Sequence, residues 1–234
     1  MELIRKSNWS CAYRDGDEFV KQLNFWVPEA AEREAKASDT AYGYGILTPK
    51  YISTEIVPDV SLCLRYEYLP IKKLSNEDVL SDSKLLSQVI ELLDKLSEIK
   101  WDNSDTYWDS FLVKEFDYEF SFLNFNTQKY SDFIHSLIPS VFIHGDCSIY
   151  NMGLLDNHLV IFDFQHGSLG PEGWDKAYFM ATIKRNTISN YCLSDREQRM
   201  AELIAAIRLG RAIKKNLKEI PIRREIYESW KSIW

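Results

Sequence analysis

The spacing of the hydrophobic residues changes near residue 70, and this change is the strongest constraint on the fold. Residues 18–23 and 61–69 alternate between two faces, as half-buried strands do. Over residues 85–99, apolar side chains instead recur at steps of three and four, which is typical of an amphipathic helix. The sequence therefore predicts an α+β chain of two lobes, an N-terminal lobe over 1–69 and a C-terminal lobe over 70–234.

The N-terminal lobe is predicted to be an antiparallel sheet with one helix. A turn signal at residues 14–17 joins the segment at 10–13 to the strand at 18–23. Pro28 favours a helix start, since proline fits the first helical turn, and an Ala/Glu/Lys-rich helix follows over 29–40. Further strands are predicted over 46–52 and 61–69.

The C-terminal lobe is predicted to be mainly helical. Short strands interrupt the helical pattern between residues 140 and 164. The predicted helices cover residues 85–99, 174–184, 196–217 and 224–234.

Charge and composition exclude several classes of protein. The chain has 35 acidic and 28 basic residues, a net charge of -7, which disfavours binding to nucleic acid. No stretch approaches the ~20 apolar residues that a membrane span needs, and the first ten residues show no apolar signal segment. We therefore expect a cytoplasmic protein with no membrane partner. The oligomeric state is not readable from these patterns.

The last 27 residues differ in charge from the rest. Residues 208–234 contain eight basic and three acidic side chains, a net charge of +5, so the first 207 residues carry -12. Such a segment is either a surface for a partner or the solvated face of a C-terminal helix, and the second interpretation is the more common.

Candidate chemistry is concentrated between residues 141 and 179. Asp146 and Asn151 lie in a polar loop after a short strand, and Asp163 ends a later strand. Loops at strand ends hold polar side chains without burying them. Carboxylate and amide oxygens suit Mg²⁺, so Asn151 and Asp163 are candidate metal ligands, while Asp146 is free to accept a proton from a hydroxyl group.

These residues form a recognisable motif. His144-Gly145-Asp146-x-x-x-x-Asn151, followed by Ile161-x-Asp163, resembles the signature of the aminoglycoside phosphotransferase and choline kinase family, whose members share the protein kinase-like fold. A later Gly170-Pro171-x-x-x-Asp175 segment resembles the same family. The resemblance implies that Asp146 is the catalytic base, that Asn151 and Asp163 bind Mg²⁺, and that His144 and Asp175 support the loop.

The resemblance also implies a nucleotide site in the N-terminal lobe. Lys21 would contact the α- and β-phosphates, and Glu34 would pair with that lysine, with Glu32 as the alternative partner. Residues 64–70 resemble a hinge in which the Glu67 carbonyl and the Leu69 amide contact adenine, with Tyr66 as a bulky neighbour. Ser10, at the end of a Ser7-Asn8-Trp9-Ser10 loop that replaces a glycine-rich loop, would contact a phosphate.

The implied function is a small-molecule kinase that uses Mg²⁺ and ATP or GTP. The acceptor would be a hydroxyl of an aminoglycoside or other antibiotic, a choline-like amine or an amino sugar, and no acceptor-binding residue is assigned. The alternative is a nucleotide-binding pseudokinase or scaffold. Residues 101–125, with nine aromatic and six acidic side chains, could bind a cationic acceptor, but inward packing of a helix pair is the commoner reason for such a segment.

Overall fold

The computed structural model describes residues 1–6, 10–23, 28–57, 61–121, 123, 127–188 and 193–231. These residues form two compact units. The first unit comprises Met1–Leu74 and Tyr150–Gly167, and the second comprises Ser75–Ile149 and Ser168–Trp234. No helix in the described part of the chain is long and apolar enough to cross a membrane.

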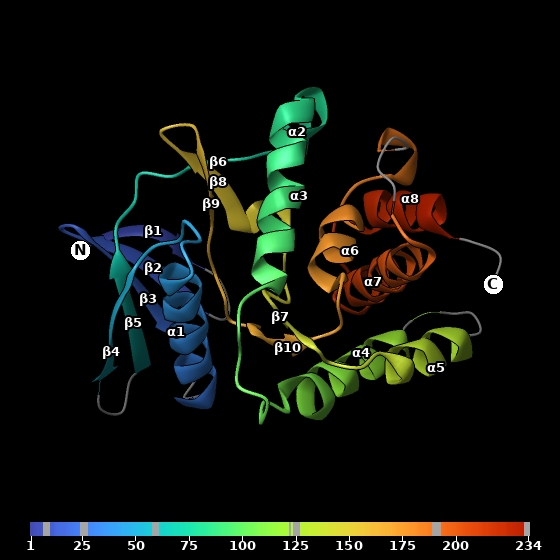
Figure 1. Ribbon diagram of the computed structural model, residues 1–234, viewed down its shortest axis with the longest axis horizontal. Coiled ribbons are helices and arrows are strands. Elements are labelled where there is room, and N and C mark those ends of the chain that lie inside the picture. Colours follow the sequence, from blue (N-terminus) through green and yellow to red (C-terminus); the bar gives the residue numbers. More distant parts are fainter. Residues whose placement is uncertain are drawn as a thin grey trace. The chain divides into compact units, whose positions relative to one another are not determined.

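A five-stranded antiparallel sheet dominates the first unit, with the strand order β1-β2-β3-β5-β4 (Figure 1). The predicted hairpin is present, since β2 pairs with β3 in an unbroken register from Ser10↔Leu23 to Asp15↔Glu18. The strands are β1 (Glu2–Lys6), β2 (Ser10–Asp15), β3 (Glu18–Leu23), β4 (Tyr51–Val57) and β5 (Ser61–Glu67).

Two parts of this sheet differ from the sequence prediction. The strand predicted over 46–52 begins only at Tyr51, because the Ile46 amide donates to the Ala41 carbonyl and closes the end of the preceding helix. Strand β1 was not predicted. All five of its residues are exposed, so it lacks the alternation of buried and exposed positions by which a strand is recognised.

One face of the sheet is covered by α1 (Pro28–Gly43) (Figure 1). Ala31 and Ala35 of this helix form a buried cluster with Leu62, Leu64 and Tyr66 of β5. Small side chains on the helix let it approach the sheet closely. Strand β3 therefore lies in the middle of the sheet, with β2 and β5 paired on its two sides, and α1 covers one face of that sheet.

A second, three-stranded sheet in the first unit has the order β6-β8-β9, with β6 at Lys72–Lys73, β8 at Met152–Leu155 and β9 at His158–Ile161. The sequence predicted lobes divided at residue 70. The compact units differ from that division because residues 150–167 return to the first unit through β6 and β8, and through a hydrogen bond from the Ile161 amide to the Leu47 carbonyl (3.1 Å).

The second unit is mainly helical and contains one short pair of antiparallel strands, β7 (Val141–Ile143) with β10 (Ser168–Gly170). Helix α8 begins earlier than predicted because Pro221 fits its first turn, and α6 ends four residues before the predicted boundary. The helices are α2 (Asn76–Ser81), α3 (Ser83–Ser97), a π-helical turn (Trp108–Leu112), α4 (Val113–Phe120), α5 (Gln128–Ser136), α6 (Trp174–Met180), α7 (Asp195–Lys214) and α8 (Ile220–Trp230). Two short 3-10 turns (Ile149–Asn151 and Arg185–Thr187) complete the elements of the described chain, the first of them leading from the second unit into the first.

The aromatic segment at 101–125 forms part of the core of this unit. Trp108 and Phe116 are buried against Trp174 of α6, with ring centroids 4.8 and 5.6 Å from that side chain. Two of its acidic residues, Glu115 and Glu119, form ion pairs with Arg211 of α7. These contacts favour the packing interpretation of the segment over a cation-binding one.

Candidate active site

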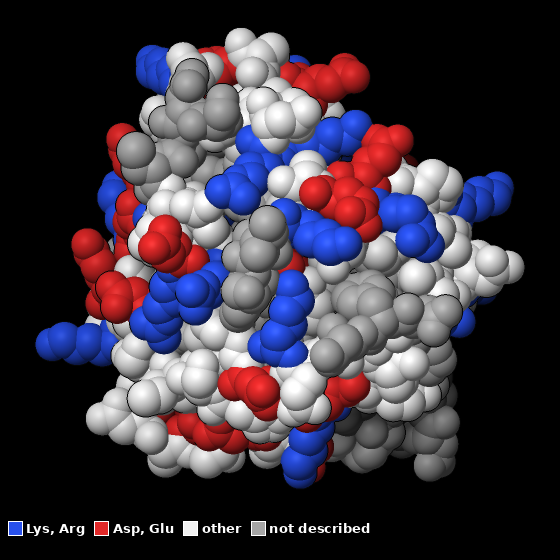
Figure 2. All heavy atoms as spheres, turned by 90° about the vertical axis from the view of Figure 1, so that its right-hand side faces the viewer, with Lys and Arg blue, Asp and Glu red and all other residues white. Residues whose placement is uncertain are grey.

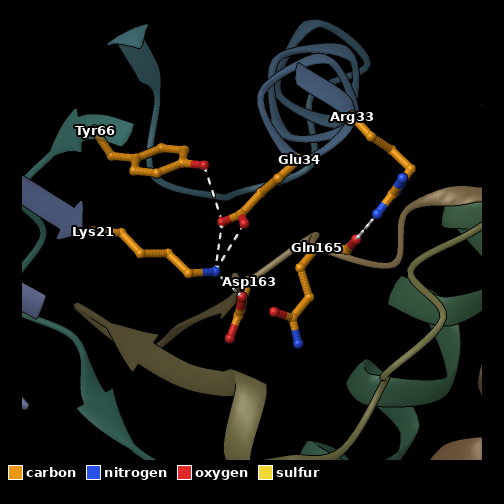
Figure 3. A network of polar contacts seen from close by, with 6 residues as sticks. All are labelled: Lys21, Arg33, Glu34, Tyr66, Asp163 and Gln165. Carbon is orange, nitrogen blue, oxygen red and sulfur yellow. Dashed lines mark hydrogen bonds and ion pairs between the residues drawn. The ribbon is translucent and has the colours of Figure 1, made fainter. Parts of the chain in front are cut away.

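Lys21 and Glu34 form a buried ion pair in the first unit (Figure 3). Strand β3 holds Lys21 between Ala12 of β2 and Leu64 of β5, and α1 brings Glu34 over the same face of the sheet. The Lys21 Nζ donates to both Glu34 carboxylate oxygens at 2.9 and 2.8 Å. Of the two glutamates that the sequence offered, Glu34 is the one paired, whereas Glu32 is exposed.

The same lysine also contacts Asp163. Its Nζ lies 2.6 Å from Asp163 Oδ1, so one cation is shared by two carboxylates. Burial lowers the pKa of Lys21, but the charges of Asp163 and Glu34 outweigh it, and the net pKa is raised. Burial raises the pKa of Glu34, and the charge of Lys21 opposes that change. The lysine therefore stays charged throughout the physiological range.

Asp163 has an unusual backbone. Its φ of 71° is in the left-handed region, which aspartate enters more readily than most side chains but at a cost of about 1–3 kcal/mol. Strain of this size is typical of functional positions. Its carboxylate is about one-third exposed, in contrast to the nearly covered side chains of Lys21 and Glu34.

Two further side chains support this arrangement and were not assigned such a role from the sequence. The Tyr66 hydroxyl donates to Glu34 Oε1 at 3.1 Å, so the residue expected to be a bulky hinge neighbour also orients the ion pair. Burial and Glu34 raise the pKa of Tyr66, which keeps it a donor. Arg33 donates to the Gln165 carbonyl, two residues beyond Asp163, at 3.2 and 3.3 Å. No local motif marks either contact, because each depends on tertiary packing.

The oxygen donors near Asp163 fit Mg²⁺. The described residues contain no group of three or more His, Cys, Asp and Glu side chains able to hold a metal ion. Magnesium that arrives with a nucleotide needs only one or two protein oxygens besides phosphates and water. Asn151 is largely buried. Its backbone carbonyl accepts a hydrogen bond from the backbone amide of Phe162 at 3.0 Å, which places Asn151 beside the residue that precedes Asp163.

The remaining predicted nucleotide contacts are partly described. Glu67 ends β5, and the Leu69 amide, in the loop that follows, has no hydrogen-bond acceptor among the described residues. Such an amide is available to a ligand, as the hinge prediction requires. Ser10 begins β2 and is half-buried, whereas residues 7–9 of the predicted phosphate loop lie outside the described part of the chain.

Asp146 lies in the second unit, in a loop held by Asp175. The Asp175 carboxylate accepts hydrogen bonds from the backbone amides of His144 (2.6 Å) and Gly145 (3.0 Å). Gly145 has a φ of 80°, which most other residues adopt only with strain, and the Asp146 amide lies 3.3 Å from His144 Nδ1. Burial raises the pKa of Asp175 despite these hydrogen bonds and the charge of His144. Asp175 therefore holds the loop backbone in place, while Asp146 stays half-exposed.

Tyr178 interacts with Asp146, and Arg208 contacts that tyrosine; sequence reasoning missed both residues. Burial and Asp146, through its charge and a hydrogen bond, raise the pKa of Tyr178 of α6, whereas the charge of Arg208 opposes that change. Arg208 Nη1 lies 3.4 Å from the Tyr178 hydroxyl. The only feature of the sequence that pointed to this arginine was the net charge of +5 over residues 208–234.

Comparison with known protein families gives a match over most of the chain. A family model described as the phosphotransferase enzyme family matches residues 14–207. Among curated proteins, no sequence matches this chain.

Several solved structures are similar over nearly the whole chain. A choline/ethanolamine kinase family protein from Mesorhizobium loti has a TM-score of 0.66 at 14% identity, covering 98% of this chain and 85% of its own. An amicoumacin kinase in complex with AMP-PNP and Ca²⁺ has a TM-score of 0.68 at 12% identity, covering 97% and 88%. The GDP complex of an aminoglycoside 2'-phosphotransferase has a TM-score of 0.63 at 17% identity, covering 98% and 91%. These similarities confirm the predicted two-lobed protein kinase-like fold.

Proposed function

Because the chain belongs to the phosphotransferase enzyme family, we propose that it transfers the γ-phosphoryl group of ATP or GTP to a hydroxyl of a small molecule. The observation that carries the proposal is the buried Lys21–Glu34 pair, which presents the lysine to Asp163 (Figure 3). A lysine held by a glutamate beside an aspartate is the arrangement by which kinases of this fold orient nucleotide phosphates.

In this proposal the first unit binds the nucleotide. Lys21 contacts the α- and β-phosphates, Ser10 contacts a phosphate, and the Glu67 carbonyl and Leu69 amide contact the base. Asp163 and Asn151 hold Mg²⁺. The ion, when bound, neutralises charge that develops on the phosphate oxygens. Glu34 and Tyr66 keep the lysine in one position, which limits the rearrangement needed during the reaction.

Asp146 is the proposed catalytic base. As the acceptor oxygen forms its bond to the γ-phosphorus, Asp146 accepts the hydroxyl proton. The bond between the γ-phosphorus and the oxygen that bridges it to the β-phosphate breaks, and the nucleoside diphosphate leaves with that electron pair. His144 and Asp175 position the base through the loop backbone.

The test is an assay of nucleotide consumption by the purified protein. ATP and GTP are each supplied with Mg²⁺ and a panel of aminoglycosides, choline, ethanolamine, thiamine, amino sugars and hydroxy acids, and Asp146→Ala is assayed in parallel. We expect turnover with at least one acceptor that the variant lacks. Nucleotide binding without turnover on any acceptor would support the pseudokinase alternative, and absence of nucleotide binding would refute the proposal.

A further inference from the structure

The basic side chains of α7 and α8 fall into two groups. Arg211 forms ion pairs with Glu115 at 3.0 Å and Glu119 at 3.4 Å, and Lys214 lies 3.5 Å from Glu119. Gly210 makes this approach possible, because a Cβ there would lie 2.6 Å from the Glu119 carbonyl oxygen. Arg211 and Lys214 are therefore neutralised by α4 of the same unit.

Arg208 and Arg223 form the second group, and no carboxylate of the described chain lies within ion-pair distance of either. Both are half-buried. Arg223 Nη1 donates instead to the Arg208 carbonyl at 3.0 Å, so the two arginines are held together. Burial lowers the pKa of Arg223 and the charge of Arg208 lowers it further, while the charge of Glu219 opposes this change without reversing it. Partly desolvated like charges that are not neutralised destabilise the fold unless a ligand pairs with them.

The arginine pair is connected to the proposed catalytic base. Arg208 lies over the Tyr178 ring, 5.7 Å from its centroid, with Nη1 3.4 Å from the hydroxyl. That hydroxyl is the partner of Asp146. One tyrosine therefore separates Arg208 from the carboxylate at which the acceptor hydroxyl would lose its proton.

Surface charge around α7 and α8 does not explain the pair as part of a general basic patch. Figure 2 shows the face of the molecule on the α7 and α8 side of Figure 1, and acidic and basic side chains are both spread over it. Part of the +5 charge of residues 208–234 is also compensated, since Arg211, Lys214 and Lys231 each form an ion pair with a carboxylate. What distinguishes Arg208 and Arg223 is their partial burial without an ion pair, their mutual contact and the contact of Arg208 with Tyr178.

We propose that Arg208 and Arg223 bind an anionic group of the acceptor, a carboxylate or a phosphate ester, while a hydroxyl of the same molecule lies at Asp146. Guanidinium groups bind these planar or tetrahedral anions through paired hydrogen bonds. This inference rests on the proposed function and narrows it to an acidic acceptor. It departs from the cationic acceptors suggested above; two of the six acidic side chains of residues 101–125, Glu115 and Glu119, are already paired with Arg211.

The first experiment compares acceptors that differ only in charge. Glycerate, glyceramide and 3-amino-1,2-propanediol share a hydroxylated chain and carry a carboxylate, a neutral amide and an amine. We expect the carboxylate compound to have a kcat/KM at least about tenfold above that of the amine, since each tenfold corresponds to ~1.4 kcal/mol of differential binding. Preference for the amine would overturn the proposal.

Variants then assign the preference to the two arginines. Arg208→Gln and Arg223→Gln are expected to raise KM for the carboxylate compound about tenfold or more and to leave the amide compound nearly unchanged, since each removes a charge-assisted pair of hydrogen bonds. Arg224→Gln is the matched control, because it removes an exposed arginine from α8, the helix that also carries Arg223. The opposite outcome is a fall in kcat in the Arg208→Gln variant that is equal for all acceptors, water included, with KM unchanged. That result would mean that Arg208 contacts the transferred phosphoryl group, and it would refute the acceptor role.

A binding measurement separates this inference from the proposed function. Calorimetric titration with glycerate and with inorganic phosphate, at saturating AMP-PNP and Mg²⁺, should detect binding that the Arg208→Gln/Arg223→Gln double variant loses and Arg224→Gln keeps. Binding of this kind in a protein without turnover would refute the kinase proposal and keep the anion site. Equal binding by the wild type and the double variant would refute the anion site whatever the turnover.

Discussion

Two clusters of charge in this molecule have opposite composition. Around Lys21, one cation is enclosed by the two carboxylates of Glu34 and Asp163. Around Asp146, one carboxylate lies beside Tyr178, with the arginine pair beyond it. A cluster with excess negative charge is suited to a divalent cation, and one with excess positive charge to an anion. Under the two proposals above, the sign of the charge that each cluster leaves uncompensated matches the charge of the ion or group it would bind.

The largest expected effect is on kcat and comes from a change at Asp146, the proposed base in the second cluster. Asp146→Asn should lower kcat by about 10²- to 10⁴-fold, the usual contribution of a general base, because the amide cannot accept the hydroxyl proton. Nucleotide affinity should be unchanged, since Asp146 is not among the proposed nucleotide contacts. Steady-state kinetics and equilibrium dialysis with ATP check both statements. Asp132→Asn, an exposed position on α5, is the control, and a variant at 146 with wild-type kcat would show that another group accepts the proton.

The next effect concerns nucleotide binding in the first cluster. Asp163→Asn should weaken Mg²⁺-dependent ATP binding by about 30-fold or more, corresponding to ~2 kcal/mol for loss of one charged partner. Asp156→Asn is a matched control, because Asp156 also has a left-handed backbone (φ 48°) in the same unit but is exposed. Equal ATP affinities of the two variants would remove the metal-binding role from Asp163.

A smaller effect is expected on folding. Glu34→Gln leaves Lys21 with only Asp163 and should reduce the free energy of unfolding by about 3 kcal/mol, as breaking a buried ion pair does. Glu32→Gln, on the exposed side of the same helix, should change it by less than about 0.5 kcal/mol. Urea unfolding of both variants makes the comparison. Similar losses at the two positions would show that the pair adds little to stability.

The smallest effect involves Cys147, which follows Asp146 in the loop. Burial raises the pKa of this thiol, and the carboxylates of Asp175 and Asp146 add to the effect. The reactive thiolate is therefore scarce between pH 7 and 9, and we expect almost no alkylation of Cys147 by iodoacetamide before unfolding. Peptide mapping by mass spectrometry measures it. Rapid labelling of the native protein at pH 8 would mean that the loop held by Asp175 opens.

Sequence patterns predicted one cluster far better than the other. Lys21, with Glu34 or Glu32 as its partner, could be assigned because the motif from His144 to Asp163 resembles a known family, and the resemblance implies a lysine on a predicted strand and a glutamate on the helix that follows. Tyr178 and the arginine pair carry no motif. Their contacts join residues 15 and 30 positions apart on separate helices, so only packing reveals them. Likewise, strand β1 could not be predicted, because all of its residues are exposed, so that buried and exposed positions do not alternate along it.

The first unit is built from two stretches of chain separated by 75 residues, and this affects its assembly during synthesis. Strand β6 at Lys72–Lys73 finds its partner at Gly153–Leu154, after about half of the second unit has been made. Closing so long a connection costs more chain entropy than a hairpin does, and a ribosome adds only ~5–20 residues per second. The three-stranded sheet of the first unit therefore waits several seconds for β8 and β9, whereas all strands of the five-stranded sheet are made by Glu67. A cut near residue 75 would leave a fragment that cannot complete its own fold.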